Sequence, residues 1–395
     1  MRPRLEVADV VRAHRERFLT YRRGRLASAE RRVLDDIAAC RTAARGGHVE
    51  RCDRCGHERI AYNSCRNRHC PKCEGPAREA WLSARMDETL PVPYAHVVFT
   101  LPPAIGTLAL HNRRRVYDIL FRASAETLCE IAADPNHLGA SIGFLSVLHT
   151  WGQTLQHHPH VHCLVPAGGL APDGSRWIAC RPGFFLPVLV LARMFRGKFL
   201  DHLVSAFDEG KLQFGGQLAN LNDPTVFRSY LAPLYHHDWV VYVRPPFGTP
   251  RQVVEYLARY THRVAISNSR LVAFHGDHVA FRWKDYRHGA KKKTMTLDAV
   301  QFLRRFLLHV LPKGFPRVRH YGFLANRSRK ARLDLCRTVL AAPAADSVVA
   351  SAPTIRGDDE VLRCSACRVG RLRFVALLPL GTSIVACSMP AHDTS

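Results

Sequence analysis

The segment from Leu155 to Val165 constrains the fold most, because it sets a His-apolar-His triplet at the head of an apolar run typical of a buried strand. Alternate residues of a strand point to the same face. His160 and His162 can therefore bind one metal ion while Val161 packs into a core. The triplet predicts a sheet with one apolar face and one face that carries a metal site.

A catalytic divalent ion normally needs a third protein ligand and open positions for water or phosphate oxygen. The candidates are His149 and Gln153, at the end of the preceding predicted strand, with His149 favoured. The alternative is an incidental pair near a turn, since the chain has 22 histidines.

Two Cys-x-x-Cys pairs lie close together near the N-terminus, with Cys65 and His69 between or beside them. Two such pairs suit one tetrahedral zinc site of four thiolates, which would hold together a segment too small for its own core. The predicted zinc ligands are Cys52, Cys55, Cys70 and Cys73. Cys65 and His69 are spare and can replace a ligand or join a second site. Buried free cysteines and a redox pair are the weaker alternatives.

A further pair, Cys364 and Cys367, lies in the C-terminal tail and forms half a zinc site. Cys387 and His392 are candidates to complete it.

Two tyrosines four residues apart, Tyr256 and Tyr260, lie in a predicted helix from Pro250 to His262 and share one face of it. Arg259 and Arg263 flank them, and cations lower the cost of a phenolate and bind the phosphate that it attacks. The pair is therefore a candidate pair of nucleophiles. The alternative is two amphipathic core aromatics.

The chain is strongly basic, with a net charge of +24 over 395 residues, and 47% of its residues are hydrophobic. Such a chain folds, and its partner is expected to be a polyanion such as DNA. The start shows no secretory signal and no apolar run reaches membrane-spanning length, so we expect a cytoplasmic, nucleoid-associated bacterial protein without a membrane partner. The predicted DNA contacts are Arg66, Arg68, Arg259, Arg263, Lys291, Lys292 and Lys293.

Strands and helices alternate from Tyr94 onward, which predicts an α+β fold with neighbouring antiparallel strands. We expect a helical arm and zinc-binding module over residues 1–90, a nuclease domain over 91–340, and a linker and tail over 341–395, where the sequence turns rich in Ala, Ser and Pro.

Several motifs in order resemble the IS91 family of transposases, which belong to the HUH endonuclease group and move DNA by a rolling-circle route. The matching stretches are Ser64 to Cys73, Trp151 to His162, Tyr256 to Ser267, Lys284 to Tyr286 and Arg304 to Phe315. The resemblance implies an RRM-like antiparallel sheet that carries the His pair, a helix that carries two nucleophilic tyrosines, and an N-terminal zinc module.

The sequence thus predicts a metal-dependent transposase that nicks and rejoins single-stranded DNA at element ends through a 5′-phosphotyrosine, with catalytic Mg²⁺ or Mn²⁺ and structural Zn²⁺. One alternative is a rolling-circle replication initiator or relaxase with the same chemistry. The other is a zinc-dependent DNA-binding regulator without catalysis.

Overall fold

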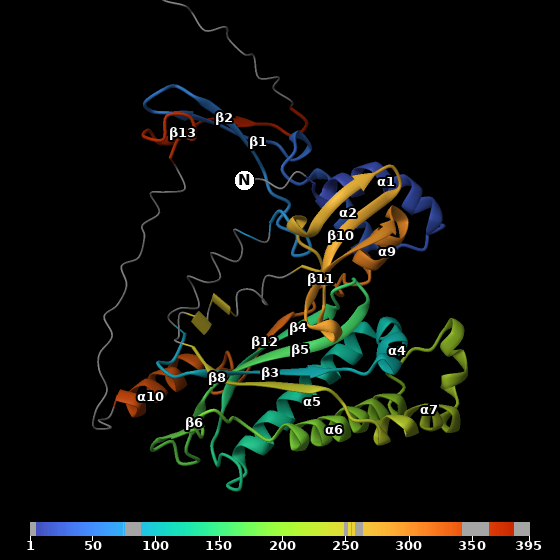
Figure 1. The fold of residues 1–395 in the computed structure, drawn as a ribbon, viewed down its shortest axis with the longest axis vertical. Helices are drawn as coiled ribbons and strands as arrows, with labels where there is room; N and C mark the ends of the chain where they lie inside the picture. The colour runs from blue at the N-terminus through green and yellow to red at the C-terminus, as the bar shows by residue number, and fades with distance from the viewer. Residues whose placement is uncertain are drawn as a thin grey trace, which may run out of the picture.

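A five-stranded antiparallel sheet forms the centre of the protein, with strand order β12-β4-β5-β3-β8 (Figure 1). The computed structural model describes residues 5–73, 75, 88–248, 252, 253, 255, 256, 264–341 and 363–382. The strands of this sheet are β3 (Tyr94–Thr100), β4 (Gly143–Trp151), β5 (His157–Pro166), β8 (Val241–Phe247) and β12 (Val318–Gly322). The predicted α+β fold, with the His pair on an antiparallel sheet, is confirmed.

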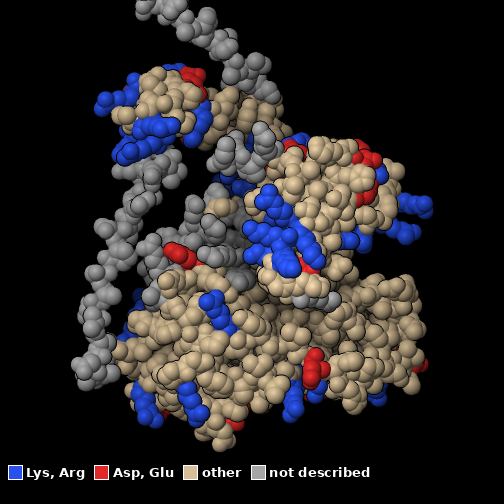
Figure 2. Space-filling view, in the orientation of Figure 1, with Lys and Arg blue, Asp and Glu red and all other residues tan. Residues whose placement is uncertain are grey.

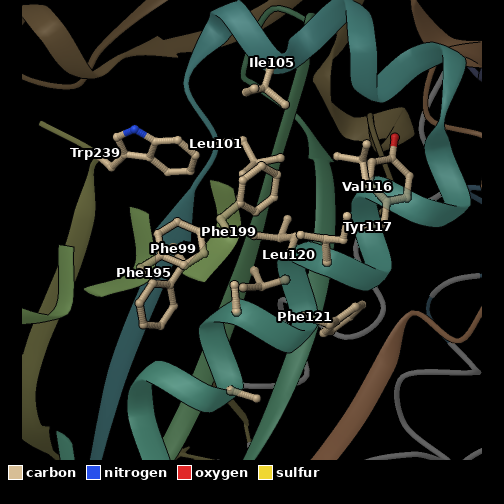
Figure 3. Packing of buried hydrophobic residues seen from close by; sticks show 14 of the residues in the cluster. Phe99, Leu101, Ile105, Val116, Tyr117, Leu120, Phe121, Phe195, Phe199 and Trp239 are labelled. Atoms are coloured by element: carbon tan, nitrogen blue, oxygen red, sulfur yellow. The ribbon is translucent and has the colours of Figure 1, made fainter. Parts of the chain in front are cut away.

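Helices cover one face of this sheet, since every second strand residue is apolar on that side. Val97 and Phe99 of β3 and Val161 and Cys163 of β5 are fully buried there. Phe99 packs on Phe195 with ring centroids 4.9 Å apart, and Figure 3 shows these rings among helix side chains. The covering helices are α4 (Gly106–His111), α5 (Arg113–Ala133), α6 (Val188–Asp208) and α7 (Pro224–His236).

The opposite face carries three histidines and a smaller apolar cluster. Tyr94, Leu145, Val147 and Leu164 are buried on it, and Val253 packs against them. Val253 comes from the segment predicted as a tyrosine-bearing helix, and the described residues of that segment are helical. The tyrosine-bearing segment therefore lies against the face that also carries the histidines.

A second lobe joins the N-terminal helices to a sheet that comes much later in the chain. Its core includes Phe18, Leu34, Phe281 and Phe302. The lobe contains α1 (Val7–Tyr21), α2 (Ser28–Ala39), β9 (Leu271–His275), β10 (His278–Asp285), β11 (Lys291–Asp298) and α9 (Ala299–Leu307). Residues 264–310 thus pack on the N-terminal arm, across the boundary that we predicted near residue 90.

The β4–β5 hairpin connects the two lobes through its tip. Leu155, at the tip, is fully buried in the core of the second lobe. The Arg305 guanidinium donates to the backbone oxygen of Thr154 at 3.0 Å, and His309 Nε2 donates to that of Leu155 at 3.2 Å. The hairpin that carries the predicted metal ligands is thereby fixed at its tip by the second lobe, and its strands are fixed by their pairing with β3 and β12.

A separate small sheet, β13-β1-β2, joins the two ends of the described chain (Figure 1). It contains β1 (Gly47–Cys52), β2 (Glu58–Tyr62) and β13 (Leu372–Leu378), and β13 pairs antiparallel with β1. The C-terminal region that we predicted as a linker and tail therefore contributes a strand to the N-terminal module.

The remaining elements are short or peripheral. They are β6 (Gly168–Leu170), β7 (Trp177–Ala179), α10 (Arg329–Ala341), and the 3-10 turns η1 (Ala43–Arg45), η2 (Pro103–Ile105), η3 (Gly216–Asn222), η4 (Asn268–Arg270) and η5 (Tyr286–His288). Within the described parts of the chain, every helix is too short or too polar to span a lipid bilayer.

Candidate active site and cysteine clusters

Three histidines meet on the open face of the central sheet, each offering a ring nitrogen within 4.8 Å of the others. The β4–β5 register places His149 directly opposite His160, and His162 lies two residues further along the same face. The ring centroids of His149 and His162 are 4.5 Å apart, and those of His160 and His162 are 4.9 Å apart. The strand alternation that predicted a shared face for His160 and His162 also places His149 on that face.

Hydrogen bonds orient two of these rings as metal ligands require. His160 Nδ1 lies 2.7 Å from the backbone oxygen of His158, to which it donates, so its Nε2 is left as the ligand atom. His162 Nδ1 lies 2.8 Å from Nε2 of His96. A ring nitrogen held by an outer partner fixes the tautomer of the ligand, so the cluster fits a divalent metal ion.

His96 also contacts this cluster, and the sequence analysis missed it. It lies on β3, is buried, and stacks on His162 with the two rings nearly parallel. Burial, aided by the charge of Arg244, lowers the pKa of His96 to about 4, so its imidazole is neutral at neutral pH. The sequence places His96 just after Tyr94, where the alternation of strands and helices begins, but does not indicate which strand pairs with its own.

Tyr256 completes a chain of contacts to the histidine cluster. Its hydroxyl lies 3.1 Å from Nδ1 of His96, whose other nitrogen contacts His162. The Tyr256 ring packs on Phe247 with centroids 5.0 Å apart, and the Arg244 guanidinium lies 5.4 Å from the Tyr256 ring centroid. Tyr256 is thus half-buried, and its hydroxyl joins the network of histidine side chains.

Other predicted site residues are elsewhere or outside the described residues. Gln153 Oε1 accepts a hydrogen bond from the backbone nitrogen of Lys284 at 3.3 Å, in the contact between the lobes. Tyr260, Arg259 and Arg263 lie outside the described residues.

The cysteines form two groups of four, not the single group that we predicted. Cys52 and Cys55 do not meet Cys70 and Cys73. The first group is Cys40, Cys65, Cys70 and Cys73, and the second is Cys52, Cys55, Cys364 and Cys367. The prediction paired the wrong knuckles because it took neighbouring pairs to share a metal, and it had no local pattern to identify Cys40.

The first cysteine group lies in the second lobe, beside the end of α2. Cys40 follows α2, and its Sγ lies 3.6 Å from that of Cys73, which lies 3.6 Å from that of Cys65. Cys65 is thus a member, as one of our alternatives held. His69 is not, and burial lowers its pKa to about 3 with help from the charges of Arg68 and Arg317.

Two of the predicted DNA contacts lie beside this group and differ in their surroundings. Arg66 is exposed. Arg68 donates to the backbone oxygen of Phe315 at 2.7 Å and to that of Pro312 at 3.3 Å. Arg68 therefore fastens the cysteine group to the central domain.

The predicted contacts Lys291, Lys292 and Lys293 are exposed at the start of β11, and Figure 2 shows Lys and Arg side chains gathered over the ends of β10 and β11. Lys293 Nζ lies 2.7 Å from Asp285, and this contact holds the pKa of that carboxyl at about 2. Lys291 and Lys292 present the more available charges to a polyanion.

Comparison with known proteins places this geometry in a family. A model described as "Transposase zinc-binding domain", of the IS91 type, matches residues 10–101, and one described as "Putative transposase" matches residues 143–332. The chain is 60% identical over 335 residues to "Putative transposase y4qJ" of Sinorhizobium fredii, covering 85% of this chain and 84% of that protein. The chain belongs to the IS91 family of transposases.

A second relative supports the same family assignment. The transposase for insertion sequence element IS801 of Pseudomonas savastanoi is 30% identical over 307 residues, covering 77% of this chain and 72% of that protein. The IS91-family transposase thus acts on DNA and carries a zinc-binding domain at its N-terminal end, as the resemblance implied.

Proposed function

We propose that this transposase nicks and rejoins single-stranded DNA at the ends of its element through a 5′-phosphotyrosine, with Mg²⁺ or Mn²⁺ held by His149, His160 and His162. The observation that carries the proposal is the line of contacts from the Tyr256 hydroxyl through His96 to His162. It connects a nucleophile to a group of metal ligands on one sheet face.

The bound ion supplies Lewis-acid polarisation of the scissile phosphate. Tyr256 Oη attacks the phosphorus, a bond forms between them, and the bond from phosphorus to the 3′ oxygen breaks. The proton of the tyrosine replaces the lost bond on that oxygen, which leaves as a free 3′-hydroxyl. In rejoining, a 3′-hydroxyl attacks the phosphotyrosine and the tyrosine is released with its proton. The linkage keeps the energy of the phosphodiester, so no ATP is needed.

Neighbouring side chains orient and stabilise the nucleophile. With His162 ligating through Nε2, its Nδ1–H donates to His96, and His96 Nδ1–H then points at the Tyr256 oxygen. That donor, with the nearby charge of Arg244, favours the phenolate that develops during attack. His96 is a positioning residue in this scheme.

Tyr260 is proposed as the second nucleophile because the sequence places it four residues after Tyr256, a spacing that would put both on one face of the predicted helix. A second tyrosine allows a second cleavage before the first linkage is resolved. The two tyrosines would thus act together in one strand-transfer reaction.

Cys40, Cys65, Cys70 and Cys73 are proposed to hold a structural zinc ion. Sulfur atoms on a tetrahedral zinc lie about 3.8 Å apart, given Zn–S bonds of about 2.3 Å, and the observed 3.6 Å separations are close to that. This ion would fasten the segment of Cys65, Cys70 and Cys73 to the end of α2 and play no part in cleavage.

The test is covalent adduct formation with labelled single-stranded oligonucleotides from the element ends in Mn²⁺, read as a denaturant-resistant shift. Tyr256→Phe and Tyr260→Phe should each keep some adduct, and the double variant should form none. Tyr242→Phe is a matched control, since Tyr242 lies on β8 beside His96, and it should behave as the parent.

Peptide mapping of the adduct supplies the decisive outcome. DNA linked to a residue other than Tyr256 or Tyr260, or adduct from the double variant, would refute the nucleophile assignment. DNA binding without any adduct in either metal would favour the non-catalytic regulator.

A further inference from the structure

Four cysteines from opposite ends of the chain meet at the end of β1. Cys52 and Cys55 come from the N-terminal module, and Cys364 and Cys367 come from the segment before β13. All four Sγ atoms lie within 4.8 Å of one another. We propose that these cysteines bind a second zinc ion, which clasps the C-terminal strand onto the N-terminal module.

The sulfur separations fit a tetrahedral ion. Cys52 Sγ lies 3.7 Å from Cys367 Sγ, and Cys55 Sγ lies 3.7 Å from Cys364 Sγ. Four thiolates around zinc at about 2.3 Å have edges of about 3.8 Å. A disulfide needs about 2.05 Å. Each short contact also joins one cysteine of one pair to one of the other, as expected when both pairs surround one centre.

Backbone hydrogen bonds point at two of the sulfur atoms. The Arg54 nitrogen donates to Cys52 Sγ at 3.4 Å, and the Gly370 nitrogen donates to Cys367 Sγ at 3.2 Å. Such donors favour thiolates over thiols, and the thiolate is the form that binds metal.

The two pairs adopt the same turn, in which the residue after the second cysteine has a left-handed backbone. Gly56 has φ +70° and Arg368 has φ +59°. Arginine adopts this conformation far less readily than glycine, so specific interactions are needed to hold the Cys364–Cys367 turn. A metal ion shared with the other pair supplies one.

Gly370 lets the two turns approach closely. A Cβ at this position would overlap Cys52 Sγ and lie 2.7 Å from Arg54 Cβ and 2.9 Å from Asp53 Oδ1. Asp53 Oδ1 accepts from the Arg371 nitrogen at 2.7 Å, which adds a direct link between the two ends.

The module has too little apolar core to hold together without a metal. The buried members of its cluster are Cys52, Cys364 and Leu372. On β13, Phe374 and Leu377 remain 62% and 77% exposed. Folding of such a small unit normally depends on a metal or a disulfide. Binding of the second zinc ion would therefore supply the stability that a larger apolar core supplies in other domains.

This site goes beyond the zinc-binding domain of the family, whose match ends at residue 101. The site can also be tested independently of the proposed cleavage chemistry, because zinc content is measured without DNA.

The experiment is zinc counting by native mass spectrometry on the full-length chain. The parent should hold two zinc ions, and the Cys364→Ser/Cys367→Ser double variant one. Cys180→Ser is a matched control, a half-buried cysteine outside both groups, and should keep two. Equal zinc content in the parent and the double variant overturns the proposal, whatever the total.

Thiol labelling of the unaltered protein gives a second reading that does not depend on a variant folding. Cys55 is exposed, so a free thiol there reacts quickly with iodoacetamide. We expect Cys55 to be protected at least tenfold until a chelator removes zinc. Fast labelling in the zinc-loaded protein would contradict the site. Gly370→Ala should shift the loss of one zinc ion to a chelator concentration at least tenfold lower, and unchanged loss would count against the close approach.

Discussion

Leu155 offers a test of how the hairpin that carries the histidines is held. It is fully buried in the core of the second lobe, yet its φ is +60°, a left-handed conformation. Leu155→Ala should lower the free energy of unfolding by about 2–5 kcal/mol, the usual cost of truncating a buried leucine.

Leu155→Gly separates the two features of this position. In ordinary backbone, glycine is about 0.5–1 kcal/mol worse than alanine. At a left-handed position alanine carries a penalty of about 1–2 kcal/mol that glycine does not. The glycine variant of Leu155 should therefore unfold with a free energy equal to that of the alanine variant or up to about 1.5 kcal/mol higher.

Leu148 is the matched control, because it is a buried leucine within the regular strand β4 of the same hairpin. There the order should reverse, with Leu148→Gly about 0.5–1 kcal/mol less stable than Leu148→Ala. Urea unfolding followed by intrinsic fluorescence measures all four variants. If glycine is worse than alanine by the same amount at both sites, the conformational argument for the hairpin tip is wrong.

Four further predictions concern the site and its surroundings. His160→Ala should abolish Mn²⁺-dependent adduct formation and leave DNA affinity within about twofold, since affinity comes from basic contacts elsewhere; adduct at the parental rate would contradict the metal assignment. His96→Ala should raise the Mn²⁺ concentration for half-maximal adduct formation about 10–100-fold, and an unchanged metal titration would remove its role. Replacing Lys291 and Lys292 by Gln should make the slope of log affinity against log salt less negative by about 1.4 on single-stranded DNA, which a parental slope would disprove. Burial lowers the pKa of His309 to about 3, so between that pH and about 6.5 the unfolded chain binds one more proton than the folded protein. The free energy of unfolding should therefore fall as the pH is lowered through this window, by at most about 1.4 kcal/mol per pH unit. His309→Gln should flatten this slope when it is measured by urea unfolding.

The histidine cluster was largely predictable because it depends on local geometry. The alternation of a strand fixed His160 and His162 on one face, and the short hairpin connection brought His149 opposite. His96 was missed because its contact with His162 depends on which strand pairs with β5, and nothing within the β3 sequence specifies that neighbour.

The cysteine groups could not be assigned from spacing. A metal ion requires particular angles and distances of its ligand atoms, but this requirement does not depend on how many residues separate the ligands in the sequence. Cys40 is a single residue after a helix, and Cys52 and Cys367 are separated by 315 residues. The prediction combined the two Cys-x-x-Cys pairs that are neighbours in the sequence. In the structure the fold of the chain determines which cysteines meet, and it brings these two pairs to different groups.

The pairing of β13 with β1 sets an order of events during synthesis. Ribosomes add about 5–20 residues per second, so Cys52 emerges roughly 15 to 60 seconds before Cys367, which follows it by 315 residues. β13 can join β1 and β2 only after most of the described chain has been made. A transposase chain that ends early, after a frameshift or a nonsense mutation upstream of Cys364, would therefore lack a closed N-terminal module even if its central sheet had folded. Translation through β13 is in this way a condition for closing that module.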